Sequence, residues 1–279
     1  MRIGMTDSIY EKLYGEKKYE LMKRHGWDCV DYQGFLDTET PLFALSGGAF
    51  DDAMKREREL ADRAGMTIWQ VHGPWRYPPR DASPEDRAER LAVMKRTIRA
   101  AALLGCSNWV IHPMMPFAPG KAQDEAVVRE VNRQFFGELL ACAHESGVTI
   151  QLENMPFPWL CISAPEEILA FVREMNDDAL RICLDTGHSA VYHIQPADAM
   201  RKLGSLVQTL HVHDNDGVRD RHSIPYTGWI DWEDFSAALT EVGFDGVLSF
   251  EAGVGKLPPA AAEYMLRAFV EAARVIARR

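Results

Sequence analysis

Side chains that can bind a metal ion end six successive apolar, β-like runs of this sequence. One such residue is more often structural than catalytic, but packing alone does not explain six in succession. A carboxylate or imidazole at the edge of an apolar core loses hydration free energy unless it is paired or coordinated. Mixed imidazole and carboxylate donors suit Mn, Zn, Co or Fe, whereas an all-oxygen set would indicate Mg or Ca. The residues are His72, His112, Glu153, Asp185, His211 together with His213, and Glu251.

The runs that carry these side chains alternate with long helical patterns, which is typical of a parallel sheet built from βα units. Eight units can be counted, and a length of 279 residues suits one barrel. We predict an α/β fold, a (β/α)8 TIM barrel forming a single domain over residues 1–279, with all strand ends at one mouth. The predicted strands are Arg2–Met5, Trp27–Tyr32, Thr67–His72, Asn108–His112, Val148–Glu153, Arg181–Asp185, Leu206–His213 and Val247–Glu251.

Capping residues support the division into repeated units. Apolar residues at helical spacing are clearest in Pro84–Leu104, Glu125–Ser146 and Pro259–Arg278. Side chains suited to N-caps precede three helical segments, namely Ser83, Ser163 and Asp231. A glycine follows a helical stretch and precedes a strand, as C′ glycines do, at positions 26, 65, 105, 147 and 243. The second unit has the weakest pattern, and Thr40–Gly48 is predicted only as a loop.

The composition narrows the class of protein. A hydrophobic fraction of 47% without low-complexity tracts indicates a globular chain with an ample core. The net charge of −10 argues against nucleic-acid binding, which needs a basic face, although a few arginines could hold one small phosphate. No apolar stretch has the length of a membrane span or of a secretory leader. With five scattered cysteines and no CxxC pair, we expect a soluble, cytoplasmic protein with reduced thiols and no membrane partner.

Eight short motifs follow one another in an order that resembles the xylose-isomerase-like TIM-barrel superfamily. They are His-Gly-Pro at 72–74, Ile-His-Pro at 111–113, Leu-Glu-Asn at 152–154, Leu-Asp-Thr-Gly-His at 184–188, His-Val-His-Asp-Asn at 211–215, Asp-Arg-His at 220–222, Gly-Trp-Ile-Asp-Trp at 228–232 and Phe-Glu at 250–251. The superfamily includes ketose 3-epimerases, inosose-type isomerases and dehydratases, and endonuclease IV. Each motif alone is weak, whereas their order across the whole chain is fairly specific.

The resemblance implies a metal site and a reaction. In sugar isomerases and epimerases of this superfamily, four successive strands hold one divalent ion, and the matching residues here are Glu153, Asp185, His211 and Glu251. Glu153 and Glu251 resemble the paired carboxylates that act as acid and base next to a sugar carbonyl. The implied function is a divalent-metal-dependent isomerase or epimerase of a sugar or sugar phosphate, in which the ion stabilises an enediolate.

Endonuclease IV has a wider, three-zinc site, and this chain carries counterparts of its additional ligands. They are His72, His112, His188, Asp220 and His222. These residues are predicted either to contact substrate beside one ion or to bind further ions. A multinuclear phosphodiester hydrolase and a metal-dependent sugar dehydratase therefore stay open as alternatives. The negative net charge and the lack of a long basic loop favour a small-molecule substrate.

Aromatic and basic side chains in the predicted mouth loops suit a sugar, which we expect as the small-molecule partner. Trp75 and Trp159 are predicted to pack on it, and Arg219 or Arg221 to hold its far end. Further aromatics of these loops are Tyr77, Phe117, Phe157 and Trp229.

Several other polar residues are given non-catalytic positions. His25 and His144 are predicted at the surface, Asn108 low in the barrel, and Gln151 either beside Glu153 or in the barrel interior. The segment Pro225-Tyr226-Thr227-Gly228 departs from the superfamily's Pro-Gly-x-Gly pattern and is predicted to shape a different substrate end. Homo-oligomers are common among such barrels, but the sequence identifies no interface.

Overall fold

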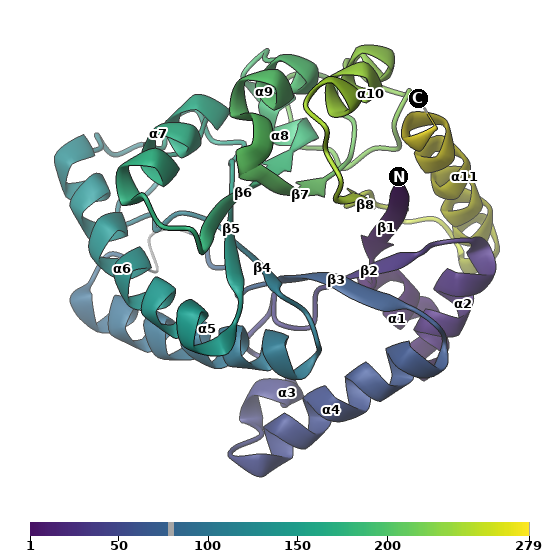
Figure 1. Cartoon of the computed structure of the whole chain (residues 1–279), viewed down its shortest axis with the longest axis horizontal. Coiled ribbons are helices and arrows are strands. Elements are labelled where there is room, and N and C mark those ends of the chain that lie inside the picture. Colours follow the sequence, from purple (N-terminus) through teal and green to yellow (C-terminus); the bar gives the residue numbers. More distant parts are fainter. Residues whose placement is uncertain (78–80, 279) are drawn as a thin grey trace.

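The computed structural model describes residues 1–77 and 81–278, and it confirms the predicted TIM barrel, with eight parallel strands surrounded by helices (Figure 1). The strands are β1 (Arg2–Thr6), β2 (Cys29–Tyr32), β3 (Thr67–His72), β4 (Asn108–Ile111), β5 (Thr149–Glu153), β6 (Leu180–Asp185), β7 (Val207–His211) and β8 (Val247–Phe250).

The helices, including two short 3-10 turns, form the outer layer. They are α1 (Ser8–Tyr14), η1 (Gly15–Lys17), α2 (Lys18–His25), α3 (Pro41–Ala44), α4 (Gly48–Arg63), α5 (Pro84–Leu103), α6 (Glu125–Ser146), α7 (Pro165–Met175), α8 (Thr186–Val191), α9 (Pro196–Leu203), η2 (Gly204–Leu206), α10 (Trp232–Glu241) and α11 (Pro259–Ala277). Among the described residues, no helix combines the length and the apolar character needed to cross a bilayer.

The barrel closes between β7 and β8. Seven neighbouring pairs follow the sheet order β7-β6-β5-β4-β3-β2-β1-β8. A parallel bridge then joins Val212, just after β7, to Phe250: the Val212 amide donates to Ser249 at 2.8 Å, and the Glu251 amide donates to Val212 at 3.1 Å. The first and last strands are also neighbours, so β1 and β8 lie side by side in the barrel wall (Figure 1).

Most predicted boundaries hold, and the differences have physical causes. Ser83 caps α5 in a capping box with Asp86, and Asp231 caps α10, as predicted. Ser163 is not a cap: the N-cap of α7 is Ala164, and the Glu167 carboxylate accepts both the Ser163 and the Ala164 amides. All five predicted C′ glycines have positive φ angles, which range from 66° at Gly147 to 108° at Gly26.

The segment Thr40–Gly48, predicted as a loop, contains the one-turn helix α3, which begins at a proline, and it ends on the first residue of α4. Four residues are too few to show a helical period in a sequence.

Strand alternation divides the side chains of each strand between the core and the barrel interior. In β5, Ile150 and Leu152 belong to the hydrophobic core. Gln151 lies inside the barrel, where its amide donates to Asn108 Oδ1 at 3.0 Å and to Gln208 Oε1 at 3.1 Å. Gln151 therefore belongs to a polar interior layer below the mouth, and Glu153, two residues further on, reaches the mouth itself.

Candidate metal centre

The four residues predicted to bind one metal ion converge at the mouth of the barrel. Glu153, Asp185 and His211 are the last residues of β5, β6 and β7, and Glu251 directly follows β8. One donor atom from each of the four lies within 4.8 Å of the other three. Two ligands on opposite sides of an ion, at bond lengths of about 2.0–2.2 Å, lie roughly 4 Å apart. The spacing therefore fits a shared divalent ion after small side-chain adjustments.

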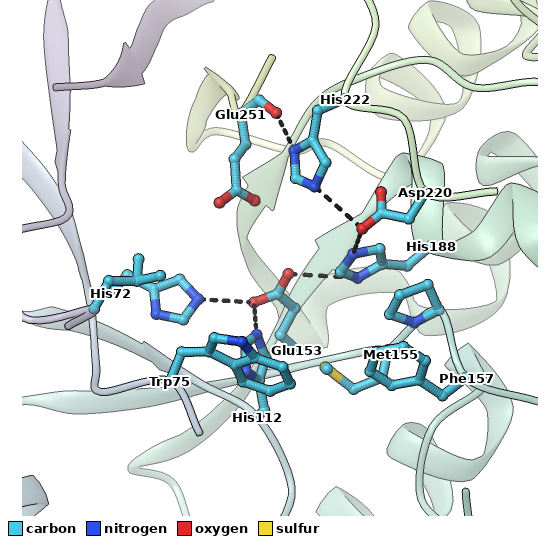
Figure 2. A pocket seen from close by; sticks show the side chains of 12 residues that line it. His72, Trp75, His112, Glu153, Met155, Phe157, His188, Asp220, His222 and Glu251 are labelled. Atoms are coloured by element: carbon cyan, nitrogen blue, oxygen red, sulfur yellow. Dashed lines mark hydrogen bonds and ion pairs between the residues drawn. The ribbon is translucent and has the colours of Figure 1, made fainter. Parts of the chain in front are cut away.

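Glu153 is the centre of the cluster, as Figure 2 shows. Its Oε2 lies 3.0 Å from Nε2 of His112 and 3.4 Å from Nε2 of His72. Its Oε1 lies 2.9 Å from Nδ1 of His211 and 3.6 Å from Nδ1 of His188. Burial alone would raise the pKa of this carboxyl group, but His211 and His112 hold it well below the ordinary value. Glu153 is therefore an anion at neutral pH, available to bind a cation.

A buried carboxylate that the sequence analysis missed orients His211. Oδ2 of Asp31, in the middle of β2, lies 3.0 Å from Nε2 of His211 and accepts the Gln70 amide at 2.9 Å. Nδ1 of His211 then faces Glu153 and also Glu251, whose Oε2 is 3.1 Å away. A carboxylate on the far nitrogen is the usual partner of a metal-bound histidine. In the sequence, Asp31 could have been noticed only as an acidic residue within the short strand-like run Cys-Val-Asp-Tyr.

Three histidines have Nδ1 bonded to a backbone carbonyl, so Nε2 is the nitrogen left to bind a metal ion once it has lost its proton. The carbonyl partners are Gly73 for His72 at 2.7 Å, Asn154 for His188 at 2.7 Å, and Glu251 for His222 at 2.6 Å. A hydrogen bond of this kind fixes the tautomer of a neutral imidazole. The same three side chains point into the pocket (Figure 2).

A second donor group lies beside the first and consists of His188, His213, Asp220 and His222. The rings of His213 and His222 stack at 4.1 Å with an angle of 12° between them. Nε2 of His213 lies 3.1 Å from Asp185, and Asp220 lies 3.1 Å from Nε2 of His222. The resemblance pointed to His188, Asp220 and His222 as additional ligands, and the structure places beside them His213, which the sequence had indicated only as a possible metal-binding side chain at a strand end.

Gly187 makes room for His213. A Cβ atom at position 187 would lie 1.9 Å from Cε1 of the His213 ring. The glycine of the Asp-Thr-Gly-His motif therefore permits the imidazole to lie against the first turn of α8, whose N-cap is Asp185. Asp185 Oδ1 accepts the His188 amide at 2.6 Å in the same turn, which fixes both residues relative to the cap.

Nearby carboxylates raise the pKa values of two histidines in the second group, His188 and His222. Burial lowers the pKa of His188, but Asp185 and Asp220 outweigh it and raise the pKa to about 10. Burial is likewise outweighed at His222, where Asp220 raises the pKa to about 9. Such histidines are protonated at neutral pH, and a divalent cation would supply the same positive charge in place of those protons. At His112, by contrast, burial lowers the pKa to about 4, which leaves a neutral ligand.

The donor groups open into a pocket of about 260 Å³. Its walls include Trp75, Met155 and Phe157. The Trp75 and His112 rings are perpendicular, with their centroids 4.6 Å apart. No lysine or arginine lines the pocket within residues 1–77 and 81–278. The pocket combines an apolar wall with a floor of carboxylates and imidazoles, so it can hold a small polar molecule over a cation.

Some of the predicted contacts lie outside this pocket. Trp159 packs on the outer side of Phe157, with ring centroids 5.7 Å apart. Arg219 is exposed, and Arg221 donates to Asp216 at 2.6 Å on the exposed part of the same loop. Neither arginine lines the pocket.

Two further histidines were assigned to the surface from the sequence. That prediction is wrong for His25, whose side chain is 2% exposed and bonds Tyr10 at 2.8 Å and Glu263 at 2.9 Å. His144 is exposed, as predicted.

Comparisons with known proteins agree with the fold. An uncharacterized protein of Methanocaldococcus jannaschii is 31% identical over 200 residues, covering 69% of this chain and 67% of that protein. The D-psicose 3-epimerase of Ruminiclostridium cellulolyticum is 24% identical over 254 residues, covering 88% of this chain and 83% of that enzyme.

Among solved structures, the crystal structure of IolI protein with a zinc atom superimposes with a TM-score of 0.76 at 16% identity, covering 99% of this chain and 96% of that one. At such low identity the superposition supports the fold alone. Residues 19–271, most of the chain, match the family model described as a xylose isomerase-like TIM barrel. The protein therefore belongs to the xylose isomerase-like TIM-barrel family.

Proposed function

We propose that this protein is a divalent-metal-dependent isomerase or epimerase of a sugar or sugar derivative. The convergence of Glu153, Asp185, His211 and Glu251 within 4.8 Å carries the proposal. The likeness to a D-psicose 3-epimerase supports a sugar as the substrate class. The mixed donor set suits Mn, Zn, Co or Fe, and the zinc atom of the IolI protein agrees with this choice. When bound, the ion would polarise a sugar carbonyl and the neighbouring hydroxyl as a Lewis acid.

Glu153 and Glu251 would transfer the proton. The Glu251 side chain is 17% exposed against 1% for Glu153, so Glu251 is the more accessible of the two. The Gln33 amide donates to Glu251 Oε1 at 2.9 Å and thereby orients the carboxylate. One carboxylate would abstract the proton beside the carbonyl, and the other would return it on the opposite face, which gives epimerisation. Return to the neighbouring carbon gives isomerisation.

The remaining pocket residues would hold the sugar and exclude water. His188 would contact a substrate hydroxyl, since it lines the pocket and Asp220 lies 3.4 Å from its Nε2. Trp75 and Phe157 would cover an apolar face of the sugar. Excluding water protects the proton in transit from exchange with solvent.

Solvent exchange in heavy water tests this proposal through the variant Glu251→Gln. The variant keeps an oxygen donor and the side-chain volume but loses the basic carboxylate. With metal-loaded protein and a ketose panel, we expect proton exchange beside the carbonyl to fall about 100- to 10,000-fold. Glu271→Gln, an exposed glutamate on α11, is the matched control and keeps wild-type exchange.

Metal content is measured in parallel, since loss of the ion would imitate loss of the base. A metal-loaded Glu251→Gln protein that exchanges at the wild-type rate would contradict the assigned proton transfer. A product lighter than the substrate by one water would instead identify a dehydratase, which uses the same proton abstraction with a leaving hydroxyl.

A multinuclear phosphodiester hydrolase is the second candidate, because two further donor groups adjoin the first. One consists of His72, His112 and Glu153, and the other is the His188, His213, Asp220 and His222 group. Against it stand the net charge of −10 and a pocket without basic lining among the described residues. A metal-to-protein ratio near three together with nicking of abasic DNA would favour the hydrolase; a ratio near one without nicking would exclude it.

A further inference from the structure

A second cavity of about 540 Å³ adjoins the metal pocket, and we call it the side compartment. Its walls come from α1, the start of α2, the segment after β2, α3 and α4. Leu36 lines both cavities. Gln33 lines the side compartment and donates to Glu251 in the metal pocket at 2.9 Å. Gln33 therefore separates the side compartment from Glu251, the proposed catalytic carboxylate, by a single side chain.

The relative sizes suggest a substrate larger than one sugar ring. Small-molecule sites typically measure about 300–1,000 Å³. The metal pocket, at about 260 Å³, lies just below that range, and the side compartment is about twice as large. Leu36, which lines both cavities, accepts a hydrogen bond at its backbone carbonyl from the Trp75 amide at 3.0 Å. This bond fixes Leu36 relative to the loop after β3.

Charge in the side compartment disfavours an anionic group. Four carboxylates line it, those of Asp7, Glu11, Asp37 and Glu57, against the single ammonium group of Lys18. The Lys18 side chain is 4% exposed, and its Nζ lies 2.7 Å from Asp7, 2.5 Å from Glu11 and 2.6 Å from Glu57. An ammonium group has three N–H donors, and these three contacts occupy them. Among the described residues that line the compartment, no free cation is therefore left to hold a phosphate.

The accessible groups suit a neutral, hydroxyl-rich ring instead. Ser8 and Asp37 are exposed and can accept or donate hydrogen bonds at the edge of the cavity. Pro41 and Leu42 on α3 supply an apolar surface on another side. Carboxylates that accept from hydroxyl groups beside an apolar patch match the two kinds of surface on a sugar ring.

We propose that the substrate is an unphosphorylated glycoside, whose reacting ring lies in the metal pocket and whose second sugar ring fills the side compartment. The inference rests on the proposed isomerase or epimerase function and defines its substrate class. Binding energy from the second, non-reacting ring would then serve to position the first.

Four fructose derivatives test this assignment on the full-length, metal-loaded enzyme: D-fructose, D-fructose 6-phosphate, and the disaccharides isomaltulose and lactulose. Deuterium incorporation at the fructose unit gives kcat/KM for each. We expect one or both disaccharides to exceed D-fructose roughly tenfold or more, and the phosphate to fall below it. A variant Ala53→Phe, which fills the side compartment from α4, should lower the disaccharide-to-fructose ratio roughly tenfold. The control Ala102→Phe changes an exposed alanine of α5 and keeps the wild-type ratio.

The outcomes separate this inference from the proposed function. If D-fructose exchanges and neither disaccharide exceeds it, or if the phosphate is preferred, the side compartment does not hold a second ring and the isomerase or epimerase function stands. If none of the four exchanges with metal-loaded protein, the result counts against the proposed function itself. Should Ala53→Phe fail to fold, as judged by circular dichroism, the comparison among substrates on the wild-type enzyme decides the question.

Discussion

Replacing Asp31 with asparagine tests whether this buried carboxylate prepares His211 for metal binding. Oδ2 of Asp31 lies 3.0 Å from Nε2 of His211, and the Gln70 amide donates to the same oxygen at 2.9 Å. Since Asp31 occupies Nε2, the ring turns Nδ1 towards Glu153 and Glu251, at 2.9 and 3.1 Å. Asparagine keeps the volume and one acceptor oxygen but loses the charge.

The magnitude follows from the burial of this pair. Partners of this kind typically contribute 10- to 100-fold to metal affinity. Neither Asp31 nor His211 has an exposed side chain, so water and salt screen their interaction little. Asparagine retains a neutral acceptor, and a charge-assisted hydrogen bond is about twice as strong as a neutral one. We therefore expect Asp31→Asn to weaken metal binding about 30-fold, or ~2 kcal/mol, and Asp31→Ala to weaken it about 100-fold.

Competition with a fluorescent chelator for Mn²⁺ or Zn²⁺ measures this affinity without reference to turnover. Asp28→Asn is the matched control: Asp28 precedes the same strand, accepts the Ile3 amide at 3.1 Å and lies at the opposite end of the barrel from the mouth. It should bind metal as tightly as the wild type. If folded Asp31→Asn protein also matches the wild type, the ring of His211 is held by other contacts and the argument is refuted.

Three further predictions concern stability. Chelating divalent ions and then restoring them at about 100 times the dissociation constant should recover ~2.7 kcal/mol, a rise in Tm of about 5 °C for a chain of 279 residues; an unchanged Tm would argue against a metal centre. Gly187→Ala should cost about 1–3 kcal/mol in urea unfolding, because the new Cβ would lie 1.9 Å from the His213 ring, and wild-type stability would mean that the ring lies elsewhere. His144 donates a hydrogen bond to the Asp177 carboxylate, which raises the pKa of this exposed imidazole above 6.5, so the stabilising effect of the bond is complete below pH 6.5 and is lost as the pH rises through the raised pKa. The difference in unfolding free energy between wild type and His144→Gln should therefore shrink with rising pH, and a difference that grows would contradict this sign.

The fold was predictable because local signals repeat in each unit. The capping box of Ser83 and Asp86 and the glycine after α6 mark helix ends within a few residues of sequence. Short helices were harder: α1 has seven residues and α8 has six, which is less than the window that a helical period needs. The strand ends at the mouth varied by one or two residues, because pairing with a neighbour, and not composition, decides where a ladder stops.

The candidate site was predictable where a donor ends its own strand and not where it depends on a distant partner. Glu153 and Asp185 each follow an apolar run that identifies their position. Asp31, in contrast, lies within a strand and contacts a histidine 180 residues further along the chain. Gln33 reaches Glu251 across 218 residues, and no local pattern distinguishes it from any surface glutamine. Contacts of this kind arise from barrel closure, which a single sequence does not display.

The meeting of the first and last strands also determines when the metal centre can assemble. Glu251 and the bridge that closes the barrel belong to the last strand, while Asp31 and Gln33 belong to the second unit. At a synthesis rate of about 5–20 residues per second, the early groups leave the ribosome roughly ten seconds or more before Glu251 does. A nascent or truncated chain would thus carry an incomplete donor set, and tight capture of an ion would report that translation has passed the eighth strand.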